Sequence, residues 1–208
     1  IVHQYRIAIR KARSLLVFMK PLLKVAFFNQ VNDQLKQFAN HFSAVRDWDV
    51  LLEYYREIYL EHVEEDSLLT DILMNEQRKH RLDAYAYFDV QDTVMAVQTY
   101  RQDLEKNGFK HKAKAVTCLA FARKRAKILR KNIEEKEKRL KLDDLKHIHS
   151  YRIANKRLRY ALELLNPAFE NAFDKRTKRL KAKTDLLGSR CDLYVMQEDL
   201  HKLNAYNN

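Results

Sequence analysis

Four residues near the N-terminus have the types and the spacing of an anion-binding site: His3, Arg6, Arg10 and Arg13. On an α-helix they fall on one side within roughly 80° of arc, in a stripe about 15 Å long. The planar arginine fork suits phosphate, and stacked cations repel one another, so that a bound anion lowers their free energy. Residues 1–32 contain no Asp or Glu that could neutralise the stripe locally.

The same pattern recurs at a constant offset of 146 residues. The segment Val2 to Pro21 aligns without a gap with Ile148 to Pro167, and eight of the 20 pairs are identical. The second stripe consists of His149, Arg152, Lys156 and Arg159. Each stripe runs beside an apolar stripe of the same helix and so borders an interface. Because it occurs twice in register, we interpret it as an anion site and not as a solvated helix face.

A weaker repeat, with an offset of 145, pairs residues 42–50 with residues 187–195. Two acids at matching positions of this repeat, Asp47 and Asp192, are predicted to orient Arg or His side chains across a helix pair, or, for Asp192, to cap a helix. Additional binding residues are predicted at the edges of the stripes and in this second repeat: Lys11, Lys20, Arg46, Arg157 and Arg190.

Other chemistry fits these residues less well. A metal ion between His3 and His149 would lie among six or more positive groups, so we expect no metal. No serine lies in a nucleophile elbow, and no zinc-type histidine pair is present. The alternating acids and bases of residues 135–139 would need a strand to share one face, but their composition favours a helix. We therefore expect no catalytic residues, no cofactor and no enzyme.

The elements that position the stripes are predicted to be helices. The 208 residues include two glycines and two prolines, which excludes most hairpin-rich sheets and phosphate-binding glycine loops. Helical periodicity predicts seven or eight antiparallel helices in one or two bundles. After the first, at residues 2–23, the expected ranges are 33–64, 67–88, 91–106, 110–141, 144–165, 171–187 and 192–203.

The chain is predicted to consist of two helical halves, residues 1–107 and 108–208. Gly108 is the best helix stop near the middle, and both prolines lie 18 residues after the first histidine of a stripe. The net charge of +12 is uneven, with −3 over residues 1–105 and +15 over residues 106–208. Residues 106–141 carry 14 Lys and Arg against three acids, which suits a nucleic-acid arm or a solvated helix face.

The paired motifs resemble those of the CHAD family, the conserved histidine α-helical domain. The resemblance rests on residues 3–13 and 149–160, and on residues 45–50 and 187–192, and it spans essentially the whole chain. It implies a single domain of two pseudo-symmetric antiparallel four-helix bundles packed around a central basic channel. It also implies that the channel binds inorganic polyphosphate and is lined by the residues of the two stripes.

The expected function is therefore non-catalytic binding of inorganic polyphosphate, with phosphate or sulfate ions in the same site. The alternatives are a nucleic-acid-binding protein that uses residues 106–141, and a scaffold that recruits partners to polyphosphate bodies. Two cysteines suggest a reducing cytoplasmic setting, and no apolar run suggests a membrane. Association with polyphosphate granules and a partner enzyme of polyphosphate metabolism are further expectations.

Overall fold

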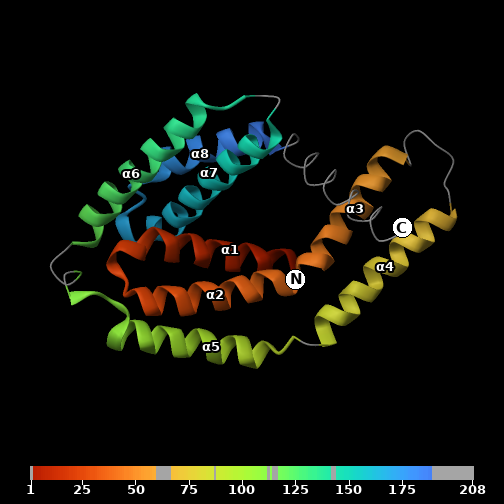
Figure 1. The fold of residues 1–208 in the computed structure, drawn as a ribbon, viewed down its shortest axis with the longest axis horizontal. Coiled ribbons are helices and arrows are strands. Elements are labelled where there is room, and N and C mark those ends of the chain that lie inside the picture. The colour runs from red at the N-terminus through yellow and green to blue at the C-terminus, as the bar shows by residue number, and fades with distance from the viewer. Residues whose placement is uncertain are drawn as a thin grey trace. The chain divides into compact units, whose positions relative to one another are not determined.

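The computed structural model describes residues 2–59, 67–86, 88–111, 113, 117–141 and 144–188. Within these ranges the chain forms eight α-helices and no strand (Figure 1), which confirms the predicted all-α class. The α-helices are α1 (Val2–Met19), α2 (Val25–His41), α3 (Ser43–Tyr59), α4 (Ser67–Ala86), α5 (Val90–Asp103), α6 (Cys118–Lys138), α7 (Leu145–Leu165) and α8 (Asp174–Leu186). The helix expected at residues 192–203 lies outside the described residues.

The contacts of the chain divide it into two compact units. Unit 1 contains the described residues of Ile1–Ile9 and Leu23–Phe109, and unit 2 those of Arg10–Leu22 and Lys110–Asn208. The division at residue 109 lies two residues from the boundary that the sequence suggested. In addition, the second part of α1 packs with unit 2. In unit 1, α3 and α4 form an antiparallel pair, and in unit 2, α7 packs on α6 and α8 (Figure 1).

Both prolines end a helix at the same point of the repeat. Helix α1 ends at Met19 and is followed by the 3-10 helix η1 (Lys20–Leu22), while α7 ends at Leu165 and is followed by the 3-10 helix η4 (Asn166–Phe169). Pro21 and Pro167 are the second residues of these turns. A proline ring cannot continue the hydrogen-bond ladder of an α-helix, which explains why each α-helix ends just before it. The two copies therefore share their local structure as well as their sequence.

The helix expected over residues 33–64 is wrong, because the structure has two helices there. Phe42 separates α2 from α3, with φ −103° and ψ 20°. Its side chain is 2% exposed, and its ring lies 5.2 Å from the ring of Tyr5 and 5.0 Å from that of Phe88. The break is thus fixed by burial of an aromatic ring, without the glycine or proline that would have marked it in the sequence.

Gly108 ends a π-helical turn, η2 (Leu104–Gly108), that continues α5. No glycine among the described residues has a positive φ, so left-handed freedom is not the reason for glycine here. A Cβ atom at Gly108 would lie 2.8 Å from Cδ1 of Leu104, closer than real contacts allow. The carbonyl oxygen of Gly108 accepts a hydrogen bond from the N–H of Lys24 at 2.9 Å. The predicted helix stop is confirmed, since the helical turns that follow α5 end at this residue.

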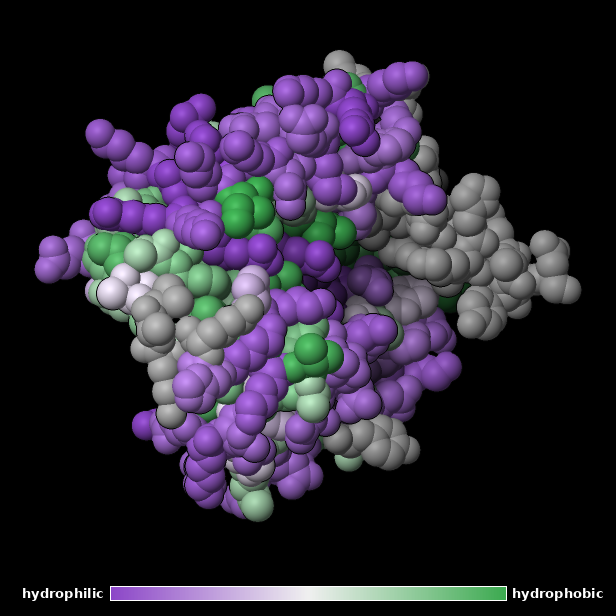
Figure 2. All heavy atoms as spheres, turned by 60° about the vertical axis from the view of Figure 1, so that its left-hand side comes forward, coloured by the Kyte–Doolittle hydropathy of each residue, from purple (hydrophilic) through white to green (hydrophobic). Residues whose placement is uncertain are grey.

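Each unit has its own apolar core. The core of unit 2 is the larger, and its largest fully buried side chains are Ile148, Leu158 and Leu162 of α7 and Phe18 of α1. In unit 1, Val45 and Phe42 pack with Tyr5 and Phe88. The face drawn in Figure 2 is mostly hydrophilic, with hydrophobic side chains in small patches. Polar side chains therefore cover most of this face, in keeping with a chain in which 33% of residues are charged.

Candidate anion-binding site

The second predicted stripe lies on α7 at the border of the core of unit 2. Its four members are half-buried: His149, Arg152, Lys156 and Arg159. The residues directly before them, Ile148, Tyr151, Asn155 and Leu158, are all buried. We call these four cationic or potentially cationic residues the α7 stripe. Their position beside the buried face, neither inside it nor opposite to it, is the one that the helical spacing predicted.

Asp144 fixes the start of α7, one turn before the stripe. Its side chain accepts a hydrogen bond from the backbone N–H of His147 at 2.9 Å and contacts the His147 ring. These hydrogen bonds lower the pKa of the Asp144 carboxyl group. The acid thus caps the helix and holds a negative charge at its positive end.

Contacts with α6 and α8 hold α7 from its sides. Lys183 of α8 donates to both carboxylate oxygens of Glu137 on α6, at 2.5 and 2.7 Å, which lowers the pKa of Glu137. Burial and a hydrogen bond with the same carboxylate raise the pKa of Tyr151 on α7. Lys136 donates to the hydroxyl oxygen of Ser150 at 2.8 Å. The backbone that carries the stripe is therefore fixed by polar contacts as well as by its core.

An acid that the sequence analysis did not single out lies at the far end of the stripe. Glu163 is 3.3 Å from Nε of Arg159 and 3.4 Å from Nζ of Lys11. The Arg159 guanidinium also lies over the ring of Tyr160, 4.7 Å from its centroid. Glu163 follows Arg159 by four residues, a spacing at which helical side chains meet, so this pair was readable in the sequence. The Glu163 carboxylate therefore lowers the net positive charge at the Arg159 end of the α7 stripe.

The second repeat reaches the stripe through Gly188. A Cβ atom added to Gly188 would lie 3.8 Å from Nη2 of Arg152, so the backbone just after α8 runs beside this guanidinium. Leu187, its neighbour, is buried in the core of unit 2. Arg190 and Asp192 lie outside the described residues, so their predicted roles stay predictions.

Arg6 lies in different surroundings from Arg152, its counterpart in the repeat. Its side chain is buried in unit 1, where Nη1 lies 3.1 Å from the Ser43 hydroxyl and 3.4 Å from the Ala39 carbonyl oxygen. These hydrogen bonds join α1 to the end of α2 and the start of α3. Arg6 therefore holds unit 1 together, and its predicted contact with a ligand stays a prediction.

The other predicted residues are distributed over both units. His3 is exposed on the part of α1 that packs in unit 1, whereas Arg10 is exposed and Arg13 half-buried on the part that packs in unit 2. Lys20 and Arg157 are exposed in unit 2. On α3, Arg46 lies 3.4 Å from the carboxylate of Glu53, and Asp47 is exposed. The orienting role of Asp47 stays a prediction.

Metal centres and membrane spans are two further kinds of site to consider for the described residues. Among these residues, no group of three or more His, Cys, Asp or Glu side chains is placed to hold a metal ion. None of the helices described in the structure combines the length and the hydropathy that a membrane crossing requires.

Comparison with known proteins assigns the family. The sequence matches the CHAD domain family over residues 1–201. The fold is similar to the crystal structure of the CHAD domain from the plant Ricinus communis, with a TM-score of 0.72 and 27% sequence identity. That match covers 99% of this chain and 69% of the plant chain. No curated protein matches the chain. The chain belongs to the CHAD domain family, as its paired motifs predicted.

Proposed function

We propose that this protein binds inorganic polyphosphate through the α7 stripe and the matching cations of α1. The observation that carries the proposal is the half-burial of His149, Arg152, Lys156 and Arg159 along one border of α7. Cations at such a border lose part of their hydration and are screened less by salt than cations that project into water. They therefore favour a ligand that presents closely spaced negative charges.

The mechanism is electrostatic docking without a chemical step. A polyphosphate chain carries a charge on every phosphate, and the stripe presents cations at successive turns of a helix about 5.4 Å apart. Arginine forks donate two parallel hydrogen bonds to phosphate oxygens, and each bound phosphate releases condensed counterions. We propose binding alone, with no reaction. The channel between two bundles, the cytoplasmic location, the association with granules and a partner enzyme stay predictions.

Alanine substitutions in the α7 stripe test the proposal. We expect the double variant Arg152→Ala, Lys156→Ala to bind long-chain polyphosphate at least tenfold more weakly in titration calorimetry, because each lost charged hydrogen bond contributes roughly 1.5–3 kcal/mol. The matched control is Lys178→Ala, Lys181→Ala, which removes the same charge from exposed positions of α8. Equal weakening in both variants would overturn the proposal and leave only a general attraction to basic charge.

Nucleic-acid binding through residues 106–141 is the second candidate. The observation that favours it is the row of exposed cations on α6, among them Arg123, Lys124 and Lys131. Competition separates the two functions, because polyphosphate has a higher charge density than a nucleic-acid strand. We expect long-chain polyphosphate to displace RNA at lower phosphate concentration than RNA needs to displace polyphosphate. The reverse order would favour the nucleic-acid function.

A further inference from the structure

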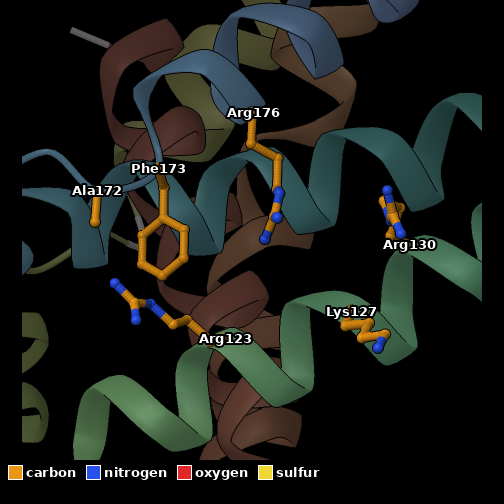
Figure 3. A pocket seen from close by; sticks show the side chains of 6 residues that line it. All are labelled: Arg123, Lys127, Arg130, Ala172, Phe173 and Arg176. Atoms are coloured by element: carbon orange, nitrogen blue, oxygen red, sulfur yellow. The ribbon is translucent and has the colours of Figure 1, made fainter.

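An open cavity lined by cations lies between α6 and the start of α8, within unit 2 (Figure 3); its three cations on α6 are exposed and the one on α8 is half-buried. Its volume is about 270 Å³. The residues that line it are Arg123, Lys127, Arg130, Ala172, Phe173 and Arg176. Four of these six are cationic and none is acidic, and none lies on α7 or belongs to either predicted stripe.

The cations reach the cavity from two helices. Arg123, Lys127 and Arg130 follow one another at spacings of four and three residues, which places them on one face of α6 within roughly 60° of arc. Figure 3 shows Arg176 extending from α8 toward α6, and the Arg123 guanidinium lying beside the ring of Phe173. That ring is 3% exposed and forms an apolar wall. The cavity thus combines a fixed wall with charged groups on either side.

These charges are largely uncompensated within the part of the chain that the structure describes. There, no carboxylate lies within ion-pair distance of Arg123, Lys127 or Arg176. Arg130 is 3.5 Å from Glu134, but both side chains are about half exposed, so this pair is weak. Asp174, two residues before Arg176, accepts a hydrogen bond from Asn166 at 2.5 Å. Four like charges around one cavity raise each other's free energy, and an anion would lower it.

We propose that this cavity binds a compact oligophosphate of the diphosphate or triphosphate kind. Four cations around so small a volume match a ligand whose phosphates are joined directly to one another. A nucleic-acid strand carries one charge per nucleotide and would bring about one or two phosphates into the same space. We propose that side chains hold the ligand, since the backbone N–H groups of Arg176 and Thr177 already donate to the carbonyl oxygen of Phe173.

Calorimetric titration with tripolyphosphate tests the site in the full chain. The background carries Arg152→Ala and Lys156→Ala, which weakens binding at the α7 stripe. The site in the cavity and the proposed function of the stripe are thereby tested separately. In this background we expect tripolyphosphate to bind, and the added changes Arg123→Ala, Lys127→Ala and Arg176→Ala to weaken it at least tenfold. The matched control removes three exposed cations of the same two helices outside the cavity, namely Lys124, Lys131 and Lys178.

The control triple variant should weaken binding less than threefold. The proposal is overturned if the two triple variants weaken binding equally, if the background protein binds no tripolyphosphate, or if a single-stranded oligonucleotide displaces it at equal phosphate concentration. Circular dichroism checks that helicity is kept. A second measurement leaves the residues of the cavity unchanged. The NMR signals of the Arg123 and Arg176 Nε–H groups should shift when tripolyphosphate is added. Unmoved signals would contradict the site.

Discussion

Arg6 and Arg152 occupy equivalent places in the repeat but have different roles in the structure. Arg6 is 9% exposed and donates to groups at the α2–α3 junction, whereas Arg152 is half-buried beside the backbone of Gly188. An arginine in a predicted anion-binding motif can therefore serve to stabilise the fold. The charge of a motif does not by itself tell which of its members hold the ligand.

We expect Arg6→Ala to lower the free energy of unfolding by about 1–3 kcal/mol, because it removes charged hydrogen bonds from a buried site. Urea unfolding followed by circular dichroism measures the change. Arg10→Ala, which removes an exposed cation one turn further along the same helix, should change stability by less than about 0.5 kcal/mol. If the two variants unfold at the same urea concentration, Arg6 does not anchor α1.

Glu163 offers a substitution that should improve binding. Its carboxylate lies close to Arg159 and Lys11 and, under the proposed function, would compete with phosphate for both. We expect Glu163→Gln to tighten polyphosphate binding by roughly twofold to fivefold, as suits a partly exposed ion pair. Glu105→Gln is the matched control, since it removes the same charge from an exposed pair with Arg101 in unit 1. Unchanged or weaker binding by Glu163→Gln would show that Glu163 positions Arg159 for the ligand.

At the scale of elements, helix ends decide where the stripe lies. Pro21 and Pro167 end α1 and α7 at the same place in the repeat, and Asp144 sets the start of α7. The helix ends marked by proline could be predicted from the sequence, because the proline ring acts on its own backbone. The break at Phe42 was not readable, because it depends on burial among rings from other parts of the chain.

The lowered pKa of Asp144 predicts how stability depends on pH. A carboxyl group whose pKa is lower in the folded state stabilises the fold above its unfolded value, about 3.8, and this contribution is lost as the pH falls through the folded pKa. Asp144→Asn keeps a capping side chain without the charge. We expect wild type to melt at a higher temperature than this variant at pH 5, and the gap to narrow as the pH falls below 3.8. A gap that stays constant over this range would contradict the charged cap.

At the scale of the whole molecule, the positive charge divides unevenly over the chain. The formal charge of +12 is the sum of +15 in the second half of the sequence and −3 in the first, yet one of the two stripes lies in the half that is net acidic. In the structure, the second part of α1, with Arg10 and Arg13, packs in unit 2 with the basic helices. Bulk basicity and the candidate site are therefore separable properties.

Salt dependence can separate them by experiment. The logarithm of affinity falls with the logarithm of salt concentration, with a slope of about 0.7 per neutralised phosphate of a single-stranded polyanion. We expect Arg152→Ala, Lys156→Ala to reduce the slope for polyphosphate by about 1.4. The control Lys178→Ala, Lys181→Ala should change it by less than half as much. An equal reduction of the slope in both double variants would show that the affinity comes from the overall electrostatic field of the molecule.

The sequence by itself determined the helical class, the repeat, the proline-marked helix ends and the position of the α7 stripe beside the core. These features depend on periodicity and on the local chemistry of single residues, which a linear sequence contains. Only the tertiary structure decided the break at Phe42, the burial of Arg6 and the cavity between α6 and α8. It also decided that Arg10–Leu22 packs with the second half. Each of these depends on which residues far apart in sequence come into contact, and no local spacing specifies that.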